Sequence, residues 1–250
     1  MDTRRKSALR QVPTGQVFAV SEGAAAAGRQ GQDMMDFTAA RTKMVDNQIR
    51  PTDVTSHAVI DAFLSVPREE FVPAAMRPLA YIDNDIALKP GRYLMEPSPL
   101  AKLIQLAAID KGDVVLEVGC GTGYASAVLS LLCGSVVALE CDEELAASAT
   151  ETLAQLGYDN VAVVNGPLEK GYAPEAPYDA IFVHGAVEQV PEALFAQMRD
   201  GGRLVVVEGT GNASQARLYI REHGITAERD AFNTSVKPLP GFSRPKEFVF

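Results

Sequence analysis

Short apolar runs alternate with longer amphipathic stretches between residues 113 and 208. Five of the runs are rich in β-branched residues: VVLEV, SVVALE, NVAVVN, YDAIFV and RLVVVEG. Their apolar residues occupy consecutive positions, which is typical of strands buried on both faces of a parallel sheet. Helical patterns over about 123–133, 142–156 and 191–199 lie between the runs. The alternation predicts an α/β fold, with a mostly parallel sheet and helices on both faces.

The segments on either side of this region have different patterns. After it, ARLYIREHG, ITAERDAF and KEFVF predict late strands that add antiparallel to the sheet. Before it, apolar residues three and four positions apart predict two helices between Asp36 and Val66, with Thr55 or Ser56 as cap of the second. From PREEFVP to about Pro99, prolines predict largely irregular chain that could cover a site, and we expect the Glu69-Glu70 pair to be solvated.

These patterns divide the chain into three parts. Residues 1–33 lack a sustained apolar period and are rich in Gly, Ala, Gln and Arg, which predicts a disordered arm. The Met34-Met35 pair that follows could serve as an alternative translation start. We expect residues 34–100 to form an N-terminal helical and loop cover, and residues 101–250 to form the core that binds the ligand.

Composition excludes several classes of protein. The chain has 250 residues, of which 47% are hydrophobic and 22% charged, as in ordinary soluble globular proteins. A net charge of −9 argues against a nucleic-acid partner. No apolar run reaches the roughly 18 residues of a membrane span, and no signal peptide is visible. The three cysteines have no metal-ligand spacing, so we expect a cytoplasmic protein without a metal site; the oligomeric state is left open.

One short stretch carries the clearest chemistry. In VLEVGCGTGYASAVL, residues 115–129, Gly119, Gly121 and Gly123 lie between the first apolar run and a predicted helix. Such a turn lets a ligand approach the backbone closely. Glu140 ends the second run, 21 positions after Gly119, where an acidic side chain can accept hydrogen bonds from both ribose hydroxyls. The pattern predicts a nucleoside site at the carboxyl edge of the sheet.

The loop differs from a dinucleotide fingerprint. In GxGxxG the third glycine would fall at Tyr124, whereas this loop is GxGxG with Glu117 two residues before it. A negative charge there suits a cationic ligand better than a pyrophosphate. The pattern resembles motif I of class I S-adenosylmethionine-dependent methyltransferases, whose Rossmann-like sheet ends in antiparallel strands. A simpler alternative, in which the glycines only ease a tight turn, leaves Glu117 and Glu140 unexplained.

A longer series of motifs extends the resemblance to roughly residues 40–241. MVDNQIRPTDVTSHAVIDAFLSVPREEFVP is followed in order by AYIDNDIAL, LGYDNVAVVNG, APYDAIFV, VPEALFAQMRDGGRLVV and PLPG. This order is similar to that of the protein-L-isoaspartate O-methyltransferase family. The resemblance implies a repair enzyme that uses S-adenosyl-L-methionine to methylate the α-carboxylate of an isoaspartyl residue in a damaged protein or peptide. The ester then collapses to a succinimide, which can reopen to normal aspartate.

The resemblance also implies which residues bind the cofactor. Glu117 and the three loop glycines would line its methionine end, Glu140 would hold the ribose, and the Gly166 region would border the adenine. Pro167 replaces an aspartate of the family, so the backbone N–H of Leu168 would serve there instead. His184 directly follows the YDAIFV strand at the ligand-binding edge. The full candidate set is Glu117, Gly119, Cys120, Gly121, Gly123, Glu140, Cys141, Gly166, Pro167, Leu168 and His184; Cys120 is also interpreted as a small packing residue.

The substrate loop departs from the family pattern. The family's loop is approximately G-x-x-I-S-x-P, whereas GRYLMEP at residues 91–97 places Met95 at the serine position, followed by Glu96. An ionised Glu96 facing the site would oppose an anionic acceptor by up to about 4 kcal/mol at ~4 Å and an effective dielectric near 20. Three interpretations stay open: Met95 is apolar wall with Glu96 outward, Glu96 is a general base or cation anchor, or Arg92 binds a carboxylate bidentately.

Three functions follow from these alternatives. The leading one is methylation of isoaspartyl protein, which needs little acid–base help because a carboxylate is already ionised at neutral pH. A methyltransferase of the same build could instead act on another acceptor, such as a peptide side chain or a small molecule. A non-catalytic protein that binds S-adenosyl-L-methionine is the third.

Overall fold

The computed structural model describes residues 35–209 and 211–243. The arm expected over residues 1–33, the possible start at Met34 and the late strand expected in KEFVF lie outside the described residues. The described residues from Asp36 onward form one compact unit. Among the described residues, no helix combines the length and the apolar character that a membrane span requires.

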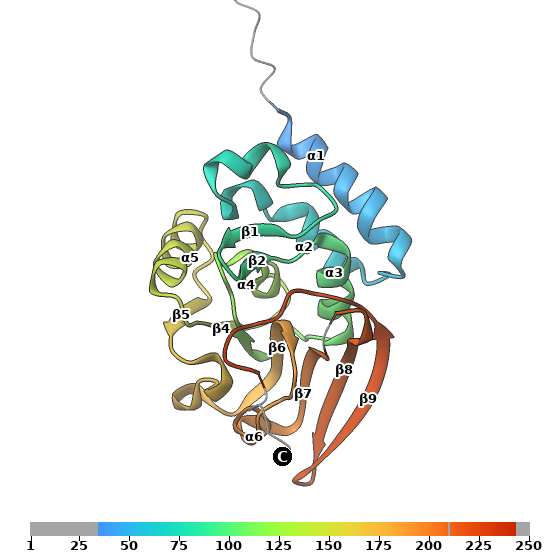
Figure 1. Cartoon of the computed structure of the whole chain (residues 1–250), viewed down its shortest axis with the longest axis vertical. Helices are drawn as coiled ribbons and strands as arrows, with labels where there is room; N and C mark the ends of the chain where they lie inside the picture. The colour runs from blue at the N-terminus through green and yellow to red at the C-terminus, as the bar shows by residue number, and fades with distance from the viewer. Residues whose placement is uncertain (1–34, 210, 244–250) are drawn as a thin grey trace, which may run out of the picture. The chain divides into compact units, whose positions relative to one another are not determined.

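The centre of this unit is a seven-stranded sheet in the order β5-β4-β3-β6-β7-β8-β9 (Figure 1). The five strands from β5 to β7 run parallel, and β8 and β9 add antiparallel, as the sequence predicted. Chain order reverses on either side of β3, and in open α/β sheets ligands bind at such a point. The strands are β3 (Val114–Val118), β4 (Ser135–Glu140), β5 (Val161–Asn165), β6 (Tyr178–Val187), β7 (Met198–Glu208), β8 (Gln215–Glu222) and β9 (Ile225–Asn233).

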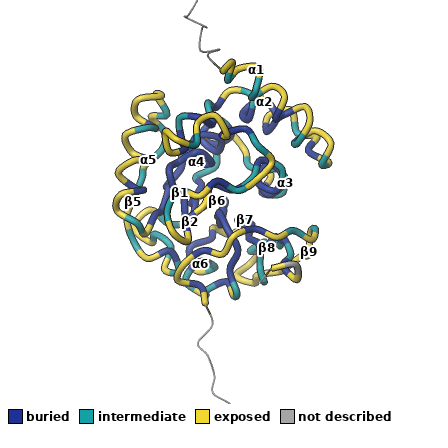
Figure 2. Tube along the Cα trace, turned by 45° about the horizontal axis from the view of Figure 1, so that its top comes forward, coloured by how far each residue is buried: buried dark blue, intermediate teal, exposed yellow. Residues whose placement is uncertain are grey.

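Two hydrophobic cores lie on opposite faces of the sheet. Val115 of β3 belongs to the larger core and its neighbour Leu116 to the smaller one, because successive side chains of a strand point to opposite faces. Strands that supply two cores have no polar face, which explains the continuous apolar runs of the sequence. Figure 2 shows the buried trace along β6 and β7 and the exposed outer parts of α5 and β9. The helices after β3 are α4 (Tyr124–Ser130), α5 (Glu143–Gln155) and α6 (Glu192–Ala196).

Two helices precede the sheet, as predicted. The first is α1 (Phe37–Met44), which continues through a turn of π-helix to Ile49. The second is α2 (His57–Ser65), and Ser56 caps it by accepting the Val59 N–H at 3.4 Å. Phe63 of α2 packs edge-on against the ring of Tyr124, so this cover is fixed directly to the helix that follows the glycine loop.

The segment between α2 and the sheet is more regular than predicted. It contains 3-10 turns at Arg68–Phe71 and Ala74–Leu79, a hairpin of β1 (Ile86–Lys89) and β2 (Arg92–Leu94), and helix α3 (Pro97–Leu106). Strands of four and three residues are too short to show a period, and proline is well tolerated at the first position of a helix. The expectation for Glu69 is also wrong, because this side chain is buried between Tyr81 and Arg41.

Candidate active site

The glycine loop connects β3 to α4 at the carboxyl edge of the sheet. Gly119, Gly121 and Gly123 have φ angles of +88°, +60° and +93°, a region that other residues rarely adopt. Space is short as well: a Cβ on Gly119 would lie 2.8 Å from Cδ2 of Leu239, and one on Gly123 would lie 3.0 Å from Cδ1 of Leu153. Backbone conformation and close packing therefore both require glycine in this loop.

Glu117 is completely buried beneath this loop. Its Oε1 lies 2.9 Å from Nδ1 of His184 at the neighbouring strand β6, and its Oε2 accepts a hydrogen bond from the Ser126 hydroxyl of α4. Nε2 of His184 is buried without a partner among the described residues. Glu117 is thus held from two sides, and the sequence reasoning missed Ser126, whose only signal was its place in the helix after the loop.

Glu140, at the end of β4, is also completely buried. Its Oε1 accepts the backbone N–H groups of Cys141 and Asp142, at 2.9 and 3.1 Å. Its Oε2 accepts the N–H of Gly121 at 2.7 Å and a hydrogen bond from Nη2 of Arg92. A carboxylate has about four acceptor positions, so these four donors use all of them.

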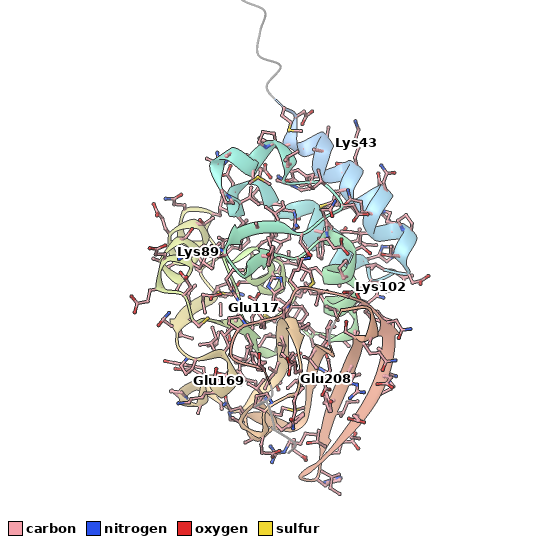
Figure 3. All side chains as sticks on the ribbon, viewed as in Figure 1. Lys43, Lys89, Lys102, Glu117, Glu169 and Glu208 are labelled. Atoms are coloured by element: carbon pink, nitrogen blue, oxygen red, sulfur yellow. The ribbon has the colours of Figure 1, made fainter. Side chains whose placement is uncertain are left out.

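Arg92 reaches Glu140 from the hairpin that precedes α3. Arg92 is 7% exposed, and its Nε has no hydrogen-bond partner among the described residues. A second ion-pair contact attaches the same hairpin to α5. The ammonium of Lys89 lies 2.7 Å from carboxylate oxygens of Asp142 and Glu144 at the start of that helix. Hydrogen bonding to these two acids raises the pKa of Lys89. Figure 3 labels Lys89 beside α5 and Glu117 near the centre of the molecule.

The remainder of the GRYLMEP loop runs from β2 into α3. The Met95 side chain is buried in the larger core, and its carbonyl accepts a hydrogen bond of 2.7 Å from the buried guanidinium of Arg68. Glu96 is half-buried, and its N–H donates to Asp85 at 3.0 Å. Burial, followed by the charges of Asp85 and Asp83, raises the pKa of Glu96. Met95 is therefore a buried apolar side chain of the core.

Comparison with known proteins decides the family. The family model "Protein-L-isoaspartate(D-aspartate) O-methyltransferase (PCMT)" matches residues 39–237. This chain belongs to the protein-L-isoaspartate O-methyltransferase family. A relative of that name from Koribacter versatilis is 40% identical over 197 residues, covering 79% of this chain and 88% of the relative. One from Roseiflexus castenholzii is 42% identical over 192 residues, covering 77% and 87%.

Solved structures agree with this assignment. A protein-L-isoaspartate O-methyltransferase superimposes with a TM-score of 0.70 at 28% identity, covering 81% of this chain and 67% of that one. A β-aspartate methyltransferase from Plasmodium falciparum, solved with S-adenosyl-L-homocysteine, has a TM-score of 0.70 and covers 80% of this chain and 98% of its own. At 17% identity it supports the fold alone. The superpositions confirm the class I methyltransferase fold predicted from the sequence. The family uses S-adenosyl-L-methionine.

The remaining predicted cofactor residues of this family member lie in varied surroundings. Cys141 is exposed beside Glu140, with its Sγ 3.5 Å from Oε1 of Glu140. Cys120 is buried, and burial raises its pKa well above the usual value, so it is a packing thiol. Gly166 donates its N–H to the Glu140 carbonyl at 3.0 Å, Pro167 is exposed, and the Leu168 side chain belongs to the smaller core.

The PLPG motif of the family resemblance lies against the glycine loop. Leu239 donates its N–H to the Ala186 carbonyl at 2.8 Å, and Ala186 donates to Lys237 at 2.9 Å, so this segment runs beside the end of β6. Figure 1 shows it in dark red, crossing the sheet after β9. The Leu239 side chain packs over both Gly119 and Gly185, where added Cβ atoms would lie 2.8 and 2.6 Å from it. The sequence analysis identified PLPG as a motif of the family resemblance but gave no role to its leucine.

Proposed function

We propose that this chain transfers the methyl group of S-adenosyl-L-methionine to the α-carboxylate of isoaspartyl residues in proteins and peptides. The observation that carries the proposal is the pair of buried carboxylates, Glu117 and Glu140, on either side of a glycine loop in a chain that matches the family model over residues 39–237. All three cysteines are free thiols, which supports a reducing compartment such as the cytoplasm.

Glu140 and Glu117 have different roles in this proposal. Glu140 would accept hydrogen bonds from the ribose hydroxyls at the end of β4, in the position expected for a nucleoside. Glu117 uses two of its roughly four acceptor positions for His184 and Ser126, which leaves two for the α-amine of the cofactor. The backbone of Gly119, Gly121 and Gly123 would lie along the methionine part, and Cys120 would pack behind it.

The adenine would lie beside the loop that follows β5. Gly166 and Pro167 border this region, and Leu168 anchors it because its side chain is buried in the smaller core. The exposed Cys141 flanks the same region from β4. Since proline replaces the family's aspartate at 167, backbone N–H groups would supply the polar contacts to the base.

S-adenosyl-L-methionine, when bound, would supply an electrophilic methyl group that an ionised carboxylate can accept without a proton transfer. The protein therefore needs to orient the carboxylate and exclude water rather than move protons. Met95 would help to exclude water as a buried apolar wall. Arg68 fixes the GRYLMEP loop by donating a hydrogen bond to the Met95 carbonyl.

A second candidate has one specific observation in its favour. Asp83, Asp85 and Glu96 gather near the substrate loop, and Lys237 lies 3.9 Å from Asp85 as a partial counter-charge. Together with the missing serine, these acids favour a methyltransferase of the same build that acts on a neutral or cationic acceptor. Met95→Ser distinguishes the two, because it should raise activity on isoaspartyl peptide only if the carboxylate binds beside residue 95.

The test is methyl transfer from labelled S-adenosyl-L-methionine to an isoaspartyl peptide, with the matching aspartyl peptide as control. Calorimetry on the same sample measures cofactor binding. Selective turnover of the isoaspartyl peptide is the expected result. Tight cofactor binding with turnover only on other acceptors would replace the proposal by the second candidate. Binding without turnover on a broad acceptor panel would mean a non-catalytic protein. Glu140→Ala should weaken cofactor binding at least about tenfold, corresponding to the loss of charge-assisted hydrogen bonds.

A further inference from the structure

Ribose and Arg92 compete for the same carboxylate. All of the roughly four acceptor positions of Glu140 are used by the N–H groups of Gly121, Cys141 and Asp142 and by Arg92. A ribose hydroxyl that donates to this carboxylate needs an acceptor position that one of the present donors gives up. Three of the present donors are backbone N–H groups, which the strand and its loops hold in place. The fourth donor is the side chain of Arg92, which can change rotamer. Arg92 is therefore the donor that must leave.

The departing guanidinium needs a new anion. Arg92 lies on the inward side of β2, between an exposed Tyr93 and the glycine loop, and its Nη1 is 3.6 Å from the position of a Cβ on Gly119. A buried cation without a counter-charge is strongly unfavourable. The anion must therefore arrive at this same place, next to the loop where the methyl group would be presented.

Other cations near the substrate loop already have partners. Arg68 is fixed by hydrogen bonds to the carbonyls of Ala80 and Met95, although its Nη1 has no partner among the described residues. Lys89 pairs with Asp142 and Glu144, and Lys237 lies 3.9 Å from Asp85. Met95, at the position of the family's serine, offers no donor. The Nε of Arg92 has no partner within the described part of the chain, and its planar guanidinium is suited to bidentate binding of a carboxylate.

We propose that Arg92 exchanges its carboxylate partner during the reaction: ribose displaces it from Glu140, and it then binds the α-carboxylate of the isoaspartyl substrate in place of the missing serine. This inference rests on the proposed function. It implies ordered binding, with cofactor first, because Arg92 is available to the substrate only after it has left Glu140. It also implies that the Arg92–Glu140 pair weakens cofactor binding.

The test uses Arg92→Gln and Arg92→Lys in the full chain, with two separate measurements. Calorimetry with S-adenosyl-L-homocysteine should show a Kd about 3- to 10-fold lower for Arg92→Gln than for wild type, since the competing cation is gone. Steady-state kinetics should show the KM for isoaspartyl peptide raised about 10- to 100-fold, as expected for loss of hydrogen bonds to a charged group. Arg92→Lys should restore part of the KM, because it keeps the charge but not the bidentate geometry.

Arg203→Gln is the matched control. Arg203 of β7 pairs with Asp113, which precedes β3. The substitution therefore breaks an arginine–carboxylate pair at the opposite edge of the sheet. It should lower the melting temperature without changing the Kd or the KM.

A higher Kd in Arg92→Gln would overturn the proposal, because Arg92 would then bind the cofactor's own carboxylate or only support the hairpin. An unchanged KM would overturn the substrate role. If the wild type does not turn over isoaspartyl peptide at all, the proposed function fails and the substrate role with it, whereas the change in Kd still decides whether Arg92 competes with ribose.

Discussion

His184 and Glu117 join two neighbouring parallel strands at the carboxyl edge of the sheet, with Nδ1 of His184 2.9 Å from Oε1 of Glu117. Both side chains are almost completely buried, at 2% and 0% exposure. The imidazole therefore fixes one oxygen of the Glu117 carboxylate, and the Ser126 hydroxyl fixes the other. The sequence placed His184 at the ligand-binding edge, and in the structure its Nδ1 contacts Glu117.

Replacement of His184 tests this support. His184→Ala should weaken binding of S-adenosyl-L-homocysteine about 2- to 10-fold, the equivalent of one hydrogen bond that orients Glu117. His184→Asn should recover much of the affinity, because an amide nitrogen can take the place of Nδ1. Calorimetry on both variants provides the measurement. Equal affinities in wild type and His184→Ala would show that Ser126 alone fixes Glu117.

The glycine loop predicts a difference between two alanine substitutions. Gly119 and Gly201 have similar positive φ angles of +88° and +79°, so alanine costs about 1–2 kcal/mol of backbone strain at either site. Only Gly119 also meets a neighbour, since its Cβ would lie 2.8 Å from Leu239, whereas Gly201 has nothing within 4 Å. Gly119→Ala should therefore lose about 1–3 kcal/mol more in the free energy of unfolding. Urea titration measures both, and Leu239→Ala should recover part of the difference.

Glu96 predicts a pH dependence of stability. Burial and neighbouring acids raise its pKa in the folded state, so the folded protein holds this proton more tightly than the unfolded chain does. The contribution of Glu96 to stability is then fully present below its unfolded pKa and is lost as the pH rises through the folded pKa. Glu96→Gln should be more stable than wild type at pH 7, and the difference should narrow in acid. Unfolding curves from pH 4 to pH 7 test this, and a difference independent of pH would assign the effect to packing.

Replacement of the buried Arg68 should cause a large loss of stability. Arg68 is completely buried, donates to the carbonyls of Ala80 and Met95 at 2.8 and 2.7 Å, and lies 4.7 Å from the centre of the Tyr124 ring. Arg68→Met keeps most of the volume but leaves two buried carbonyls unsatisfied, so unfolding should become easier by about 3 kcal/mol.

Arg77→Ala is the control for Arg68. Arg77 is exposed and its ion pair with Glu70 lies at the surface, so the expected change is below about 1 kcal/mol. Similar losses in both variants would contradict the buried role of Arg68.

The sheet and the glycine loop could be predicted because their signals are local. VVLEV and RLVVVEG are mostly apolar at consecutive positions, because β3 and β7 contribute to both hydrophobic cores. Glu140 follows the loop at a spacing set by one strand–helix–strand unit. The hairpin β1–β2 left no such signal, because its strands have only four and three residues.

Contacts between distant segments could not be predicted in the same way. Arg92 and Glu140 are 48 positions apart, and nothing in either local pattern indicates that they meet. Glu69 was expected in solvent because its neighbours in sequence are polar, yet its partners are Tyr81 and Arg41 from other segments. Such pairs depend on packing within the cover and between the cover and the sheet, and a local sequence pattern does not report either.

The last strand of the sheet protects the protein against unwanted pairing. β9 is an edge strand whose residues are mostly exposed, so its free N–H and C=O groups could act as a template for a strand of another molecule. Glu228, Arg229 and Asp230 stand in the middle of this strand, and Arg217 of β8 lies 3.0 Å from Asp230. A second strand that added here would have to accommodate three successive charges. The charged centre of β9 thus disfavours aggregation through the open edge.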